Sequence, residues 1–234
     1  MTLPAAFQRC RTHRKGLGMT KRRFGDLDGF FTPPARGGAA SSLIVILHGW
    51  GADASDLADL AYPVSLRFPG AAFFVPDAPD VCSMNPMGRQ WFDLGDLENG
   101  PPVAAAVILP CLADACAALD LGMDAVALTG FSQGGMMSLH CGLGTAPAPA
   151  AIVSFSGALL QPAAIIDNPA PPAVMLVHGT DDQVVPFSSI DRARDLLATR
   201  GITAETVARP GLGHGIDPDA LSAAIDFLAR TLPA

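Results

Sequence analysis

Short apolar runs alternate along the chain with longer segments of mixed character. Each apolar run is bounded by turn-forming residues, which is typical of buried parallel strands joined by crossover helices. The predicted strands are 42–47, 72–75, 125–129, 151–155, 173–177 and 204–208, and the predicted helices are about 55–67, 103–119, 134–142, 188–199 and 218–230. This order predicts an α/β fold with an open, mostly parallel central sheet, helices on both faces and ligands at the carboxyl ends of the strands.

Proline interrupts the most apolar of the predicted helices. Pro110 lacks an amide proton and clashes with the preceding turn, so we expect it to kink or split the helix at 103–119. It also breaks the longest apolar stretch, which therefore falls short of the roughly 18 to 20 residues that span a bilayer. Stable membrane insertion is not expected.

Composition indicates a folded globular protein. The chain has 234 residues, of which 50% are hydrophobic and 16% charged, and its 24 glycines and 21 prolines are spread out. These values exclude a disordered, coiled-coil or collagen-like chain, and the length fits one sizeable domain.

Positive charge is concentrated at the N-terminus. Residues 1–23 hold seven of the fifteen Lys and Arg residues and no acid, which leaves 8 basic against 22 acidic residues in the remaining 211. The excess of acidic residues in 24–234 repels phosphate groups and so disfavours binding to nucleic acid. We expect residues 1–38 to be a basic, flexible extension and 39–234 to be the folded α/β domain. An organellar transit peptide and a true start at Met19 remain alternatives.

The five cysteines show neither disulfide nor metal spacing. They are Cys10, Cys82, Cys111, Cys116 and Cys141. Their number is odd, they form no CxxC or Cys/His cluster, and a chain of this size folds without disulfide bonds. We therefore expect reduced thiols, no bound metal and a cytoplasmic location.

The strongest chemical signal is a Gly-x-Ser-x-Gly sequence at 130–134. It follows a predicted strand and precedes a predicted helix, which is the setting of a nucleophile elbow. The tight turn requires glycine at both flanking positions and projects the hydroxyl of Ser132 above the sheet. The sequence therefore predicts that Ser132 is a catalytic nucleophile.

A nucleophilic serine needs a histidine base, which in this fold follows it in the chain. His140 lies inside the helix after the elbow, where packing is the expected role, and His178 ends a strand, where a hydrogen bond to a loop is expected. His214 lies in a glycine-rich loop before the last helix and can reach back over the sheet. We predict His214 as the base. Two adjacent carboxylates, Asp181 and Asp182, are candidates to orient it, and spacing does not choose between them.

Two backbone amides are predicted to bind the oxyanion. One is the N–H of Gln133, directly after the nucleophile, and the other is the N–H of Trp50, in a glycine-rich loop after the first predicted strand. The indole of Trp50 is then available to line the substrate pocket. His48, in the same loop, is expected to stabilise that loop.

Six motifs, in this order, resemble the phospholipase/carboxylesterase family of α/β-hydrolases, which includes acyl-protein thioesterases and small bacterial carboxylesterases. They are LHGWGAD at 47–53, PDAP at 76–79, WFDL at 91–94, GFSQGG at 130–135, HGTDDQVVP at 178–186 and GLGHGID at 211–217. The resemblance implies an α/β-hydrolase fold and a triad of Ser132, Asp182 and His214, with Trp50 and Gln133 as oxyanion donors. It also implies that Trp91 and Phe92 flank the acyl site, and that the chain forms a homodimer. Many relatives have a small aliphatic residue in place of Trp50, which implies a differently shaped acyl pocket.

Together these features predict a serine hydrolase that cleaves carboxylic esters, or thioesters, through an acyl-enzyme and without a cofactor. The expected substrate is a small-molecule or lipid-like ester. Alternatives are an acyl-protein thioesterase, a lactone hydrolase of the dienelactone type, whose elbow carries cysteine instead of serine, a membrane-associated lipase, and an inert hydrolase fold used for binding.

Overall fold

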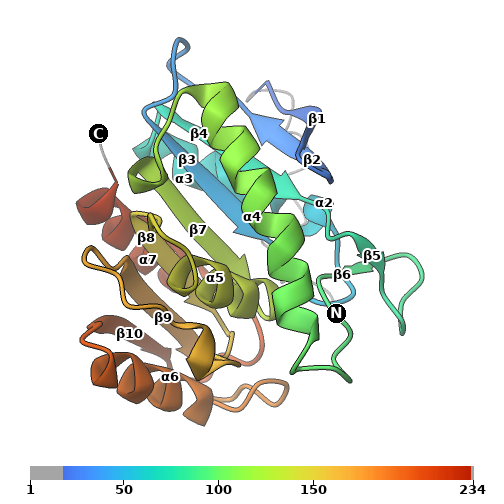
Figure 1. Cartoon of the computed structure of the whole chain (residues 1–234), viewed down its shortest axis with the longest axis vertical. Helices are drawn as coiled ribbons and strands as arrows, with labels where there is room; N and C mark the ends of the chain where they lie inside the picture. Colours follow the sequence, from blue (N-terminus) through green and yellow to red (C-terminus); the bar gives the residue numbers. More distant parts are fainter. Residues whose placement is uncertain (1–17, 233–234) are drawn as a thin grey trace.

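The computed structural model describes residues 18–232, in which eight strands form one sheet (Figure 1). The strands are β1 Thr20–Phe24, β2 Leu27–Thr32, β3 Ser42–Leu47, β4 Ala71–Pro76, β7 Val126–Phe131, β8 Ala151–Phe155, β9 Ala173–Gly179 and β10 Ala204–Arg209. Their order is β1-β2-β4-β3-β7-β8-β9-β10. The strands β3, β4, β7, β8, β9 and β10 run parallel, and the β1–β2 hairpin is antiparallel at one edge. The prediction of a mostly parallel α/β sheet is confirmed.

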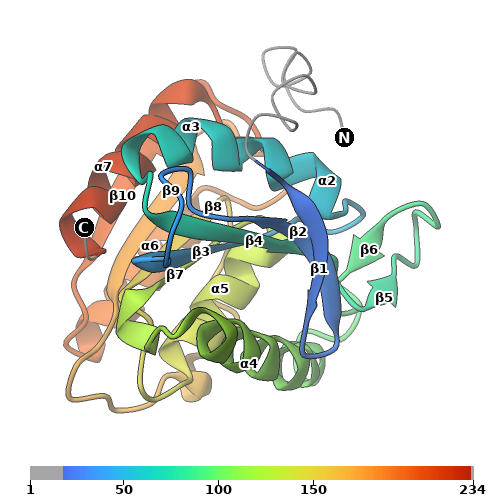
Figure 2. The same ribbon diagram turned by 90° about the horizontal axis from the view of Figure 1, so that it is seen from above.

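Helices cover both faces of this sheet (Figure 2). One face carries α2 Ala54–Leu57, η3 Ala58–Leu60, α3 Ala61–Arg67 and α7 Pro218–Thr231, and the other carries α4 Gly100–Leu119, α5 Gln133–Leu143 and α6 Ser188–Thr199. Two short turns, η4 Met123–Ala125 and η5 Pro162–Ala164, lie in the connections. Because both faces are covered, central strands such as β3 are buried at every position and have no polar alternation.

The N-terminal hairpin corrects the prediction that residues 1–38 form a flexible extension. Strands β1 and β2 join the sheet, and Phe24, Leu27 and Phe31 are buried in its core. The hairpin was missed because β1 is an edge strand whose first four residues are exposed and mostly basic, so it lacks an apolar pattern. The predicted role of residues 1–17 lies outside the described part of the chain.

Helix α4 is not split at Pro110, and it corrects the expectation that the apolar stretch is too short to span a bilayer. It runs unbroken through Pro110, which lies on the exposed side together with Ala106, so water can satisfy the carbonyl that Pro110 leaves without a donor. By length and composition this helix is also apolar enough to cross a membrane. In the fold, however, its buried face packs in the core cluster beneath β1, β2 and α5.

Four cysteines lie within the described residues, and all four are buried free thiols: Cys82, Cys111, Cys116 and Cys141. Burial raises the pKa of Cys111 to about 12, and it raises the pKa of Cys141 further. Cys10 lies outside the described residues. The prediction of reduced, buried thiols is confirmed for these four.

A two-stranded hairpin outside the main sheet follows β4. Strands β5 Asp80–Val81 and β6 Arg89–Gln90 pair antiparallel to form a small hairpin beside the main sheet (Figure 1). The loops after β3, β7, β9 and β10 all leave the carboxyl edge of the parallel strands, since β3, β7, β8, β9 and β10 are consecutive neighbours in the sheet. That edge therefore gathers the residues singled out in the sequence.

Candidate active site

Ser132 occupies a sharp turn between β7 and α5. Its backbone has φ 54° and ψ −117°, a region that few residues other than glycine adopt. Two hydrogen bonds fix this conformation, since the Ser132 N–H donates to the Phe155 carbonyl at 2.8 Å and the Met136 N–H donates to the Ser132 carbonyl at 2.9 Å. The hydroxyl is thereby presented at the start of α5.

The two glycines that flank Ser132 are dictated by close backbone contacts. A Cβ atom on Gly130 would lie 2.3 Å from the Gly134 carbonyl oxygen, and one on Gly134 would lie 2.0 Å from the Leu47 carbonyl oxygen. Real Cβ atoms do not approach backbone this closely, so any larger residue would push α5 away from β3. The spacing of the motif therefore follows from packing.

This packing leads to a stability prediction. Gly134→Ala is expected to lower the free energy of unfolding by about 3 kcal/mol or more, because backbone must move to admit the methyl group. Gly215→Ala is the matched control, since a Cβ atom there meets no atom within 4 Å. Urea denaturation of the two variants tests this, and equal stability would contradict the steric argument.

Ser132, His214 and Asp182 form a continuous hydrogen-bonded chain. His214 Nε2 lies 2.9 Å from Ser132 Oγ, and His214 Nδ1 lies 2.7 Å from Asp182 Oδ2. The imidazole is only 4% exposed and packs against the ring of Phe131 at a centroid distance of 4.8 Å. A carboxylate opposite Nδ1 keeps the proton on that nitrogen, which leaves Nε2 free to accept the serine proton.

The Asp182 carboxylate is fully satisfied. Oδ1 accepts the amides of Val184 and Val185 at 2.8 and 2.9 Å, and Oδ2 faces His214 and also His178 Nε2 at 3.2 Å. Burial alone would raise the pKa of Asp182, but the hydrogen bonds from His214 and the two amides outweigh it and hold the pKa below its ordinary value. Asp182 is therefore ionised at neutral pH.

The two adjacent aspartates, which spacing could not distinguish, have different surroundings. Asp181 is exposed and its carboxylate accepts the hydroxyl of Thr180 at 2.9 Å, so it does not contact His214. Its backbone instead ties the loops together, since the Asp181 N–H donates to the Leu212 carbonyl at 3.0 Å. The structure thus brings Asp182, and not Asp181, to the imidazole.

An ion pair closes the base of the loop that carries His214. Arg209 ends β10, and its guanidinium donates to both carboxylate oxygens of Asp217 at 2.9 to 3.1 Å. Asp217 also caps α7 by accepting the Ala220 N–H at 2.7 Å. Burial would raise the pKa of Asp217, but Arg209 and the cap lower it on balance. The loop that holds His214 is therefore anchored at both ends.

The two predicted oxyanion donors belong to segments that adjoin Ser132, in the chain or in space. Gln133 begins α5, where amides lack an acceptor within the helix. Trp50 follows Gly49, on which a Cβ atom would lie 3.5 Å from the Ser132 Cβ. Among residues 18–232, neither amide donates a hydrogen bond, whereas the neighbouring amides of Gly51 and Ala52 donate to the Arg89 and Gly49 carbonyls.

Trp91 and Phe92, which the resemblance places beside the acyl site, support the site from the core. They are 2% and 3% exposed and belong to the core cluster beneath α4. The Trp91 indole donates to the His48 carbonyl at 2.9 Å, and the Gln133 side chain accepts from the Trp91 N–H and donates to the Phe92 carbonyl. The buried amide of Gln133 was not foreseen, because no sequence pattern marks such a contact.

The other three histidines among residues 18–232 contact loops or lie within a helix, away from the Ser132 hydroxyl. His48 Nδ1 lies 2.8 Å from the Gly49 carbonyl and its Nε2 accepts the Ala78 N–H at 3.0 Å, while burial lowers its pKa. His178 Nε2 lies 2.9 Å from the Val185 carbonyl, which confirms the predicted loop contact. His140 lies in α5, away from the triad, and burial lowers its pKa. Within residues 18–232, no group of three His, Cys, Asp or Glu side chains has a metal-binding arrangement.

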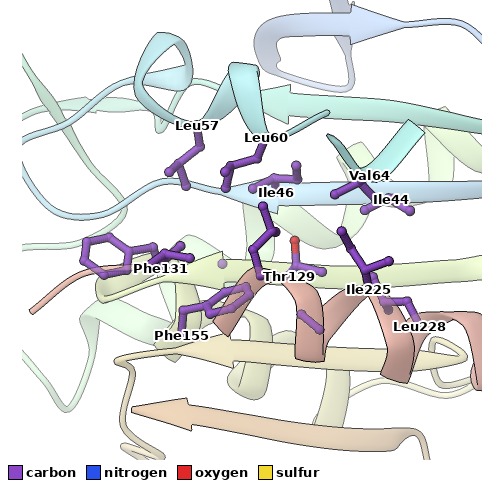
Figure 3. A pocket seen from close by; sticks show the side chains of 14 residues that line it. Ile44, Ile46, Leu57, Leu60, Val64, Thr129, Phe131, Phe155, Ile225 and Leu228 are labelled. Atoms are coloured by element: carbon purple, nitrogen blue, oxygen red, sulfur yellow. The ribbon is translucent and has the colours of Figure 1, made fainter. Parts of the chain in front are cut away.

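An apolar pocket lies on the opposite side of β7 from α5, between α3, α7 and the sheet (Figure 3). Thr129 is the one polar side chain in its lining, and its hydroxyl donates to the Val45 carbonyl at 3.0 Å. The pocket reaches Phe131, which contacts His214, but it offers no group that can take part in proton transfer. The chemistry of the site therefore resides at the carboxyl edge.

Comparison with known proteins gives consistent results. A family model described as Phospholipase/Carboxylesterase matches residues 34–232. The solved structure of the esterase PE8 is similar with 39% identity and a TM-score of 0.83, over 88% of this chain and 99% of that one. Esterase YpfH of Escherichia coli is 28% identical over 203 residues, 83% of this chain and 84% of the relative. Acyl-protein thioesterase 1 of Neurospora crassa is 34% identical over 116 residues, 47% of each chain.

Proposed function

The chain belongs to the phospholipase/carboxylesterase family of α/β-hydrolases, and from this premise we propose that it hydrolyses carboxylic esters through Ser132, His214 and Asp182. The observation that carries the proposal is the contact of His214 Nε2 with Ser132 Oγ at 2.9 Å, while Nδ1 faces Asp182 at 2.7 Å. This is the geometry that a serine nucleophile needs for activation at neutral pH.

Acylation begins when Ser132 Oγ attacks the ester carbonyl carbon. The hydroxyl proton passes to His214 Nε2, and the resulting imidazolium is stabilised by the ionised carboxylate of Asp182. The amides of Gln133 and Trp50 donate hydrogen bonds to the negatively charged carbonyl oxygen. Removal of one such donor typically raises the activation barrier by about 3 kcal/mol. The carbon–oxygen bond to the alcohol then breaks, and the alcohol leaves with the proton from His214.

Deacylation follows the same steps with water as the nucleophile. His214 takes a proton from water, the hydroxide adds to the acyl carbon, and the acid is released as Ser132 recovers its proton. The ring contact between Phe131 and His214 holds the imidazole in place through both half-reactions. A thioester follows the same path, with a thiol as the leaving group.

A series of p-nitrophenyl esters from acetate to palmitate tests this proposal. We expect turnover with an optimum at one chain length, and an initial burst of p-nitrophenol where deacylation is the slower step. An acyl-thioester series of the same chain lengths, followed by release of the thiol, measures the preference between oxygen and sulfur esters. Failure to hydrolyse any ester or thioester, by enzyme whose fold is intact by circular dichroism, would overturn the proposal.

A further inference from the structure

One hydrogen bond joins the proposed oxyanion loop to the β5–β6 hairpin through the side chain of Trp50. The indole Nε1–H donates to Gln90 Oε1 at 3.1 Å, and the same oxygen accepts the Ser83 N–H at 3.1 Å. Gln90 is 6% exposed, whereas Trp50 is half-buried. A buried acceptor therefore holds the edge of a partly exposed aromatic ring.

Both ends of this hydrogen bond are next to residues that touch the nucleophile turn. Trp50 follows Gly49, whose Cα approaches the Ser132 side chain so closely that a Cβ atom would lie 3.5 Å from the Ser132 Cβ. Gln90 precedes Trp91, whose N–H donates to the Gln133 side chain at 2.9 Å. The backbone of Trp50 therefore lies next to the nucleophile turn, while its indole contacts Gln90 of the hairpin.

The backbone of the same loop is held independently of the indole. The Gly51 N–H donates to the Arg89 carbonyl at 2.8 Å, the Arg89 N–H donates to the Ala52 carbonyl at 2.7 Å, and Asn85 Nδ2 donates to the Gly51 carbonyl at 2.8 Å. Loss of the Gln90 contact would therefore free the ring without releasing the backbone amide of Trp50. Side-chain position and oxyanion geometry can be separated by mutation.

We propose that Gln90 is a specificity-determining residue, which fixes the Trp50 indole as a wall of the acyl site and so favours short acyl chains. This inference rests on the proposed esterase function. Without Gln90 Oε1 the indole N–H of the half-buried Trp50 loses its acceptor, and the ring would turn to bring this donor to water, because a donor without an acceptor is costly. That rotation removes the wall and lengthens the acyl site.

Gln90→Leu tests the proposal, since leucine has a similar volume but no acceptor. The measured quantity is the ratio of kcat/KM for p-nitrophenyl octanoate to that for the acetate, and we expect it to rise at least fivefold, mainly through a lower KM for octanoate. Trp50→Phe, which removes the donor and keeps an aromatic ring, should shift the ratio in the same direction. If Gln90→Leu fails to fold, Trp50→Phe provides the test of the proposal by itself.

Two control variants separate specificity from general loosening. Gln90→Glu retains the acceptor and should keep the wild-type ratio. Asn85→Ala removes a different bond between the same hairpin and loop, and should leave the ratio within twofold of wild type. An equal change in the octanoate-to-acetate ratio of kcat/KM in Asn85→Ala and Gln90→Leu would overturn the proposal. So would a ratio that changes in neither Gln90→Leu nor Trp50→Phe.

A second ester series assigns the side of the site. Acetates of alcohols from methanol to octanol keep the acyl group constant, and we expect their relative rates to be unchanged in Gln90→Leu. A shift confined to this series would place the indole beside the leaving group and contradict the acyl assignment. Wild-type enzyme that hydrolyses no ester would remove the esterase function and this inference together, whereas an active wild type with unaltered variants removes the inference alone.

Discussion

Ser132→Ala is expected to lower kcat for p-nitrophenyl acetate by about 10⁴-fold or more, on the scale of nucleophile deletions in other serine hydrolases. Alanine removes the oxygen that His214 Nε2 contacts at 2.9 Å but leaves the strained turn with the same Cβ atom. The variant should therefore fold like wild type. The loss must appear in catalysis and not in stability.

Covalent labelling provides the direct measurement. A fluorophosphonate should modify wild type at Ser132, as shown by mass spectrometry, and leave Ser132→Ala unlabelled. Ser138→Ala is the matched control, because Ser138 lies in α5, the helix that begins directly after Ser132, and its hydroxyl donates to the Gly134 carbonyl at 2.9 Å. We expect this control to retain labelling and more than half of the wild-type activity. Unchanged esterase activity in Ser132→Ala would show that another group performs the attack.

The sequence predicts best those parts of the protein whose structure is determined by the local pattern of apolar and turn-forming residues. The strand at 42–47 and the helix at 188–199 were predicted with the bounds that the structure gives them, because burial and turn residues mark both ends. Likewise, the glycines around Ser132 are readable because each excludes a Cβ atom from a backbone contact. The strand and the helix depend on near neighbours in the chain, whereas the contact that excludes a Cβ atom on Gly134 is with Leu47 of a distant strand.

The features that escaped prediction depend on pairs of residues far apart in the chain. The sequence does not distinguish an indole that lines a pocket from one that supports a loop, and only the fold shows that Trp91 donates to the His48 carbonyl. The side-chain contact between Trp50 and Gln90 spans 40 residues and has no local signature. The edge strand β1 was missed for a different reason, since charged residues on an edge serve solubility and carry no core pattern.

Asp182→Asn is expected to lower kcat at neutral pH by about 10⁴-fold, the effect of the equivalent change in a serine protease triad. The amides of Val184 and Val185 both donate to Oδ1, so the asparagine carbonyl oxygen must take that position. The NH₂ group then replaces Oδ2, where it would face the Nδ1–H of His214. Two donors cannot pair, and the imidazole is driven to the tautomer that carries its proton on Nε2, which cannot accept the proton of Ser132.

Asp181→Asn is the matched control for this prediction. Asp181 is exposed, its side chain accepts only the Thr180 hydroxyl, and an asparagine oxygen can accept the same bond. We expect kcat within about twofold of wild type. The measurement is kcat for one ester across pH 5 to 9 in wild type and both variants, since the low pKa of Asp182 keeps it ionised over that whole range. The stability that this carboxylate contributes is present above the unfolded-state pKa of about 4 and is lost as pH falls through its lower folded-state pKa, below the assay range. A large loss in Asp181→Asn with near-normal Asp182→Asn would reverse the assignment of the acid.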